Sequence, residues 1–93
     1  MLPLQTIATG VVADIIRRQP MSPGKVTFAW TTAVGAALAR ATTVELRDGL
    51  LLVTPRDARW ATEVDRAAST ILRRVQILLG ADAVTALRVR TPS

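Results

Sequence analysis

The sequence contains no cysteine and no histidine, and these two absences exclude several kinds of site. Without cysteine, neither a disulfide framework nor a thiolate zinc site can form. Without histidine, the chain lacks the usual general base of enzymes and the commonest neutral metal ligand. We therefore expect neither a bound metal nor a cofactor.

Catalytic motifs are missing as well. The five glycines stand apart from one another, so they form no glycine-rich phosphate-binding loop. Ser22 and Ser69 have no histidine to activate them, and nothing marks Lys25 as a nucleophile. The few carboxylates form no motif that pairs one with another. The sequence therefore predicts a protein that is not an enzyme.

Long hydrophobic runs are also absent. No apolar stretch approaches the length that crosses a bilayer, and the N-terminus lacks the pattern of a signal peptide. No linker, repeat or low-complexity segment divides the 93 residues. We expect a single cytoplasmic domain without a membrane partner, with an N-terminal helix and connection in residues 1–21 and the core in residues 22–90.

Positive charge is abundant and comes almost entirely from arginine. Lysine and arginine number 12 against 7 acidic residues, which gives a net charge of +5, and Lys25 is the single lysine. Arginine suits bidentate phosphate contacts, and a small basic domain suggests a polyanionic partner. The alternative is that the charge only aids solubility and that a GC-rich genome favours arginine codons.

Residues 44–53 predict a β-hairpin. Asp48-Gly49 supplies the positive φ angles that a two-residue type I′ turn needs, and this turn pairs Arg47 with Leu50. Side chains alternate across a strand. One face of the hairpin therefore carries Val44, Leu46, Leu51 and Val53, and the other carries Glu45, Arg47, Leu50 and Leu52.

A long helix is predicted after the hairpin. Pro55 ends the second strand, and Asp57 is the expected N-cap. Apolar residues recur at helical spacing from Trp60 to Leu78, and Gly80 is the expected C-cap. Hairpin and helix bury their apolar sides most simply against each other, which predicts a core position for Trp60.

Two helices are predicted before the hairpin and one strand at the end of the chain. Residues 4–19 have an apolar face, and Ser22 is expected to cap a second helix that runs to about Arg40, with Trp30 in the core. Residues 84–90 alternate in the manner of a half-buried strand. The predicted fold class is α+β in the order ααββαβ, with helices on one face of a three-stranded sheet.

The third helix carries the first candidate interaction surface. Arg59, Arg66 and Arg73 recur every seven residues, so they form a stripe along a continuous helix, flanked by Arg56 and Arg74. The alternative is an ordinary solvated face, because Glu63 can pair with Arg59 or Arg66.

The outer face of the sheet is the second candidate, with Arg47, Arg88 and Arg90 around Leu50 and Leu52. A basic rim around an apolar centre is typical of an interaction face. The alternatives are an ordinary exposed sheet face or one covered by a second copy, so we expect a monomer or a weak homo-oligomer. We assign partner binding to Arg47, Leu50 and Leu52, and nucleic-acid binding to Arg59, Arg66, Arg73, Arg74, Arg88 and Arg90.

Several motifs follow one another in a fixed order between Ser22 and Arg90. They are Trp30 followed by Val34-Gly35, then Leu46-x-Asp48-Gly49-x-Leu51-x-Val53, then Trp60-Ala61-x-Glu63, and finally Leu87-x-Val89-Arg90. In this order and at these spacings, the set resembles the DciA family of bacterial replicative-helicase operators.

The resemblance implies a KH-like domain without the GXXG loop. It also implies association with the DnaB-type helicase, help in its loading, weak DNA contact and no catalytic activity. Family members commonly carry a longer basic extension, whereas this sequence ends at Ser93. The alternative function is a KH-like RNA-binding module near the ribosome. The missing GXXG argues against it, because that loop clamps the nucleic-acid backbone.

Overall fold

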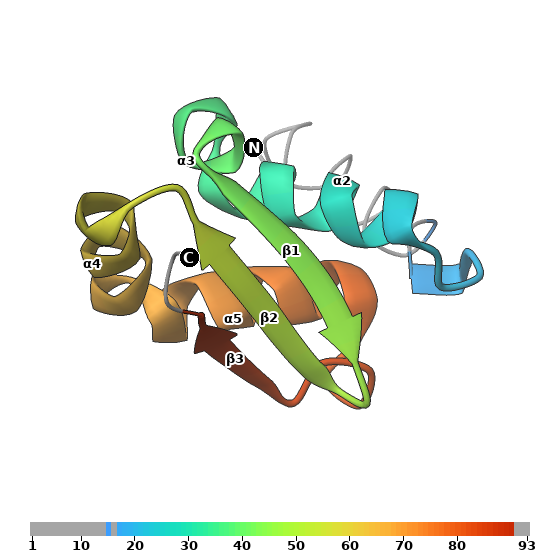
Figure 1. The fold of residues 1–93 in the computed structure, drawn as a ribbon. Helices are drawn as coiled ribbons and strands as arrows, with labels where there is room; N and C mark the ends of the chain where they lie inside the picture. Colours follow the sequence, from blue (N-terminus) through green and yellow to red (C-terminus); the bar gives the residue numbers. More distant parts are fainter. Residues whose placement is uncertain (1–14, 16, 91–93) are drawn as a thin grey trace, which may run out of the picture.

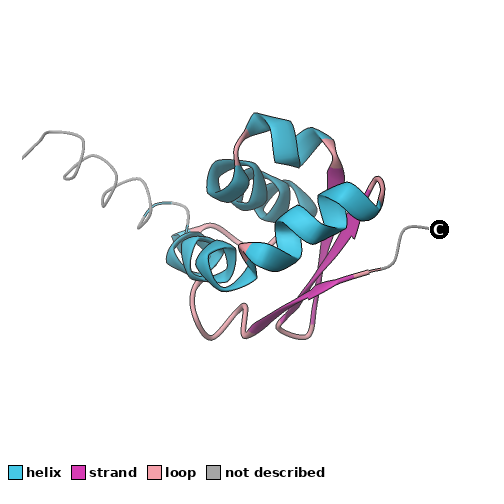
Figure 2. Ribbon diagram, turned by 90° about the vertical axis from the view of Figure 1, so that its left-hand side faces the viewer, coloured by secondary structure: helices cyan, strands magenta, loops and turns pink. Residues whose placement is uncertain are grey.

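The structure of the chain is a computed structural model that describes residue 15 and residues 17–90. A three-stranded sheet forms one layer, and helices cover one of its faces (Figure 1, Figure 2). The α+β class and the order ααββαβ are confirmed, although the first predicted helix, residues 4–19, lies almost wholly outside the described residues. The described elements are α2 (Pro23–Val34), α3 (Ala36–Arg40), β1 (Thr42–Arg47), β2 (Leu50–Pro55), α4 (Ala58–Arg66), α5 (Ala68–Leu79) and β3 (Ala86–Val89).

The β1–β2 hairpin has the predicted turn and register. Asp48 and Gly49 have φ angles of 47° and 82°, as a type I′ turn requires, and Arg47 pairs with Leu50. The N–H of Thr85 donates to the carbonyl of Gly49 at 2.7 Å. A Cβ atom at Gly49 would lie 3.0 Å from Thr85 Oγ1. Glycine is therefore required both by the turn and by the close approach of the segment that leads into β3.

Strand β3 joins the hairpin on the side of β2 and runs parallel to it. Val53 pairs with Val89, and the N–H of Arg90 donates to the carbonyl of Val53 at 2.7 Å. Between β2 and β3 the chain forms α4 and α5, which lie on the helical side of the sheet (Figure 1). Strand β2 is consequently the central strand, with a neighbour on each side that can shield its side chains.

The core lies between the helices and the inner face of the sheet. Trp30 belongs to it with an exposed fraction of 2%. Trp30 Nε1 donates to Thr42 Oγ1 at 2.8 Å, and the Thr42 hydroxyl donates to the carbonyl of Leu38 at 2.8 Å. The polar atom of the buried indole thus has a partner, as buried polar groups require. The largest fully buried side chains are Trp30, Leu51, Val53, Val64, Val75 and Val84.

The helix caps follow the predictions. Ser22 Oγ accepts a hydrogen bond from the N–H of Lys25 at 3.1 Å, at the start of α2. Asp57 Oδ1 accepts one from the N–H of Trp60 at 3.1 Å, at the start of α4. Each cap satisfies an N–H group that the first turn of a helix leaves unpaired. At the other end, Gly80 terminates α5 with a φ of 100°, which favours glycine.

Neither of the two long helices predicted around the hairpin is continuous. Gly35, with a φ of 87°, separates α2 from α3. Ala67, with a φ of −103° and a ψ of 10°, separates α4 from α5 and changes the direction of the chain (Figure 1). On the two sides of this break, α4 buries Val64 and α5 buries Ile71. Apolar spacing alone does not reveal the second break, because alanine is a strong helix former.

Candidate interaction surfaces

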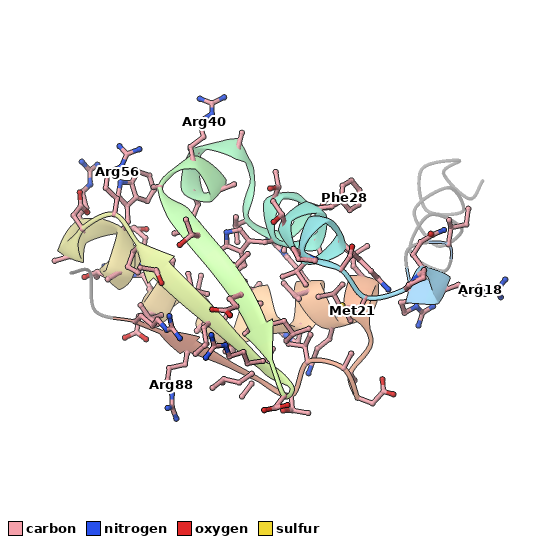
Figure 3. The ribbon with its side chains drawn as sticks, turned by 45° about the vertical axis from the view of Figure 1, so that its right-hand side comes forward. Arg18, Met21, Phe28, Arg40, Arg56 and Arg88 are labelled. Carbon is pink, nitrogen blue, oxygen red and sulfur yellow. The ribbon has the colours of Figure 1, made fainter. Side chains whose placement is uncertain are left out.

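The face of the sheet that carries no helix is the first candidate surface. Arg47 and Arg88 are exposed on it, and Arg88 projects away from the sheet (Figure 3). Arg47 Nε and Glu45 Oε1 form an ion pair at 2.8 Å, which adds little to stability because both groups are exposed. The outer face, as defined by the strand register, consists of Thr43, Glu45, Arg47, Leu50, Leu52, Thr54, Ala86 and Arg88.

The two leucines at the centre of this outer face are less exposed than the strand alternation predicts. Leu52 has an exposed fraction of 8%, and Leu50 is half-buried. Glu45 and Arg88 stand directly opposite Leu52 on the two flanking strands. The aliphatic stems of long charged side chains cover apolar neighbours in this arrangement. The expectation of two fully exposed leucines is therefore corrected, because charged side chains shield the apolar centre.

The arginines of α4 and α5 form the second candidate surface. Arg59, Arg66 and Arg73 are all exposed. The break at Ala67 places the first two on α4 and the third on α5. The predicted stripe required a continuous helix, and it is instead divided between two helices that run in different directions (Figure 1). Arg66 Nη1 lies 3.9 Å from Glu63 Oε1, in agreement with the predicted pairing of that glutamate.

Arg74 makes a contact within the fold that its neighbour Arg73 does not make. Arg74 Nη1 donates to the carbonyl of Ala33 at 3.2 Å. That carbonyl lies in the last turn of α2, where the helix leaves carbonyl groups without an intrahelical partner. Part of the hydrogen-bonding capacity of Arg74 is thus used to join α5 to α2. Arg90 directly follows β3, and its side chain is exposed.

Trp60 does not occupy the core position that the sequence predicts. It is half-buried in the first turn of α4, and the guanidinium carbon of Arg59 lies 6.0 Å from the centroid of its ring. Helix α4 instead turns Val64 into the core, where its exposed fraction is 0%. Val64 lies one turn beyond Trp60 on the same side of α4, so this helix reaches the core only at the later turn. Part of the indole ring is therefore available at the surface.

Sequence reasoning missed an apolar surface near the start of α2. Met21 and Phe28 have exposed fractions of 45% and 47%, and Figure 3 shows both in this region. The pattern of apolar residues in α2 gives no sign of this exposure, because Phe28 lies outside its buried side. A groove of about 320 Å³ between this region and β1 is lined by Met21, Ser22, Pro23, Val26, Val44, Glu45 and Leu46.

The part of the chain that the structure describes has neither a candidate metal site nor a candidate membrane-spanning helix. No group of three histidine, cysteine, aspartate or glutamate residues gathers there in a way that could hold a metal ion. None of the helices in that part is both long and apolar enough to cross a membrane.

A small basic α+β domain with a charged outer sheet face and exposed arginines has the features of an interaction module. The chain belongs to the DciA family, since the family model described as "Dna[CI] antecedent, DciA" matches residues 3–89. This match agrees with the motifs that resemble that family and extends beyond them toward the N-terminus.

Curated relatives are similar over most of this chain. A UPF0232 protein of Rhodococcus jostii (strain RHA1) is 34% identical over 90 residues, which cover 90% of this chain and 48% of the relative. A UPF0232 protein of Mycobacterium ulcerans (strain Agy99) is 32% identical over 74 residues, which cover 78% of this chain and 40% of the relative. The chain thus spans about half, or less, of the length of these curated relatives.

Proposed function

We propose that the chain is a non-catalytic adaptor that associates with the DnaB-type replicative helicase and assists its loading in DNA replication. The observation that carries this proposal is membership of the DciA family over residues 3–89. A role at the replicative helicase places the protein in the cytoplasm. The absence of histidine and cysteine from the sequence supports a role in binding, because it removes the commonest catalytic groups.

The proposed helicase contact is the outer sheet face, centred on Leu50 and Leu52 with Arg47, Arg88 and Arg90 around them. Protein interfaces combine a desolvated apolar centre with a polar rim, and arginine is enriched in them. The charged side chains opposite Leu52 are long and exposed, so they can move aside when a partner docks. Binding then buries the two leucines against the partner while the arginines remain at the rim.

A paired substitution tests this contact. Leu50→Thr together with Arg88→Glu alters the centre and the rim, and threonine suits a strand surface, so the fold is expected to persist. We expect helicase affinity, measured by calorimetry, to fall by more than about fivefold, which corresponds to about 1 kcal/mol. The circular-dichroism spectrum should stay unchanged.

The matched control for this test lies on the helical side of the molecule. Ile77 and Arg73 are both exposed on α5, and Ile77→Thr with Arg73→Glu makes the same kinds of change there. The control is expected to keep its affinity for the helicase. An unchanged affinity of the sheet-face variant, or an equal loss in the control, would place the helicase contact elsewhere.

Weak DNA binding without sequence preference is the second part of the proposed function. The contacts are assigned to exposed arginines, and the net charge of +5 supports this assignment. Binding of this kind depends on the release of counterions from the phosphate backbone, so it weakens as salt is added. Arg74 contributes less than the others, because it already donates to the carbonyl of Ala33. The arginines assigned to DNA are Arg59, Arg66, Arg73, Arg74, Arg88 and Arg90.

A further inference from the structure

A separate basic region lies at the open end of the hairpin, where β1 begins and β2 ends. A groove of about 290 Å³ opens there, and no carboxylate lines it. Arg40 and Arg56 project from the same end of the molecule (Figure 3). The residues that line the groove are Arg40, Ala41, Thr42, Thr43, Thr54, Pro55 and Arg56.

Two hydrogen bonds to backbone carbonyl groups hold Arg56 in this groove, beside Arg40. The N–H of Arg56 donates to the carbonyl of Ala41 at 2.7 Å. Arg56 Nη2 donates to the carbonyl of Arg40 at 3.4 Å, across 16 positions of sequence. Arg40 is the last residue of α3, and Arg56 directly follows β2. The fold therefore places the guanidinium group of Arg56 on the backbone of Arg40, so that two arginines unrelated by sequence spacing line one groove.

Thr43 and Thr54 add hydroxyl groups to the groove. They stand directly opposite each other in the β1–β2 register. Neither hydroxyl bonds to another described residue, whereas the Thr42 hydroxyl is engaged by Trp30 and Leu38. Hydroxyl donors beside two guanidinium groups match the acceptor oxygens of a phosphate. The groove thus has the donors and the charge of a site for a phosphate group.

The residues that follow Arg56 in the sequence favour a nucleic-acid strand, rather than a free anion, as the ligand of this groove. Asp57, the next residue after Arg56, accepts the N–H of Trp60 as the cap of α4, so its carboxylate is engaged. Trp60 is half-buried and lies four positions beyond Arg56. Single strands bind without sequence preference where a basic groove holds the backbone and aromatic rings stack on the bases. The groove offers the basic part, and Trp60, four positions after Arg56 in the sequence, offers the aromatic part.

We infer that this groove binds a phosphodiester group of a single-stranded nucleic acid. Arg40 and Arg56 contact its oxygens, and Thr43 and Thr54 donate their hydroxyl groups. The inference rests on the proposed DNA contact and gives it a defined anchor, made of residues that the arginine spacing does not identify. Trp60 stacks on a base of the same strand.

A double substitution tests the anchor. Arg40→Gln with Arg56→Gln is compared with the unaltered protein in binding a short fluorescent oligothymidylate at low salt, by anisotropy. We expect affinity to fall by about tenfold, because a groove contact adds to the general attraction of a basic protein. The variant should keep its fold, since both side chains are exposed.

The matched control removes the same charge from another part of the surface. Arg18→Gln with Arg47→Gln changes two exposed arginines that are not assigned to DNA, and this variant is expected to lose less than about threefold in affinity. Equal losses in the two variants would overturn the inference, because they would reflect net charge alone. A duplex that binds as tightly as the single strand would also overturn it, because paired bases cannot stack on Trp60.

Amide chemical shifts show whether the groove binds the strand, independently of whether the protein binds the helicase. When the oligothymidylate is added to isotope-labelled protein, we expect the amides of Thr43 and Thr54 to shift first. Shifts confined to α4 and α5, or no shift, would overturn the inference even if the helicase binds. If the unaltered protein does not bind the helicase by calorimetry while these shifts appear, the adaptor role is rejected and the groove stands.

Discussion

Arg74 of α5 donates a hydrogen bond from Nη1 to the carbonyl of Ala33 in α2, at 3.2 Å, and so joins two helices that are 41 positions apart in sequence. Arg74→Met removes this bond and keeps most of the side-chain volume. We expect the free energy of unfolding, measured in urea, to fall by about 1 kcal/mol.

The neighbouring arginine is the control for this prediction. Arg73 is exposed, and no hydrogen bond or ion pair joins it to another described residue. Arg73→Met is expected to change the free energy of unfolding by less than about 0.5 kcal/mol, as at ordinary surface positions. Equal effects of the two substitutions would show that the contact with Ala33 does not stabilise the fold.

The two tryptophans are expected to differ in their contributions to stability. Trp30 is 2% exposed and its indole nitrogen is paired with Thr42, so Trp30→Ala should cost about 3–5 kcal/mol, or unfold the domain. Trp60 is half-buried, and Trp60→Ala should cost about 2 kcal/mol, because the indole ring of Trp60 buries less apolar surface than that of Trp30. Denaturant titrations of both variants check the ranking, and a larger loss in Trp60→Ala would contradict it.

Two glycine substitutions are expected to have different effects. Gly49 has a φ of 82°, and a Cβ atom there would lie 3.0 Å from Thr85 Oγ1, so Gly49→Ala should destabilise the fold by about 1–2 kcal/mol. Gly24 lies in the first turn of α2, and its nearest contact would be Ser22 Oγ at 3.9 Å. Gly24→Ala should be neutral or stabilise the fold by up to about 1 kcal/mol. Thermal unfolding of the two variants compares them directly, and equal effects would contradict this account.

DNA binding is expected to show a steep dependence on salt. If the protein contacts about four phosphates of a single strand, the logarithm of the binding constant should fall with the logarithm of the salt concentration with a slope of about −3. Charge reversal at Arg59, Arg66 and Arg73 should weaken binding and make the slope shallower, while the unfolding temperature stays the same. Anisotropy titrations at several salt concentrations measure both quantities. A slope near zero would exclude an electrostatic mode of binding.

The sequence by itself determined the elements whose causes are local. Asp48-Gly49 predicts the hairpin and its register, because the turn geometry depends only on those two residues. Ser22 and Asp57 predict the starts of α2 and α4, because a cap bonds to an N–H group three positions away. The α+β class follows from these elements, because each has one apolar side to bury.

The tertiary structure alone decided which side chains are covered and which of them meet. Leu52 is covered because two other strands place Glu45 and Arg88 opposite it, and Trp60 is only half-buried because α4 meets the core through Val64. The groove that joins Arg40 to Arg56 exists because β1 and β2 pair. Burial and proximity depend on contacts between residues far apart in the chain, and periodicity within one segment carries no record of them.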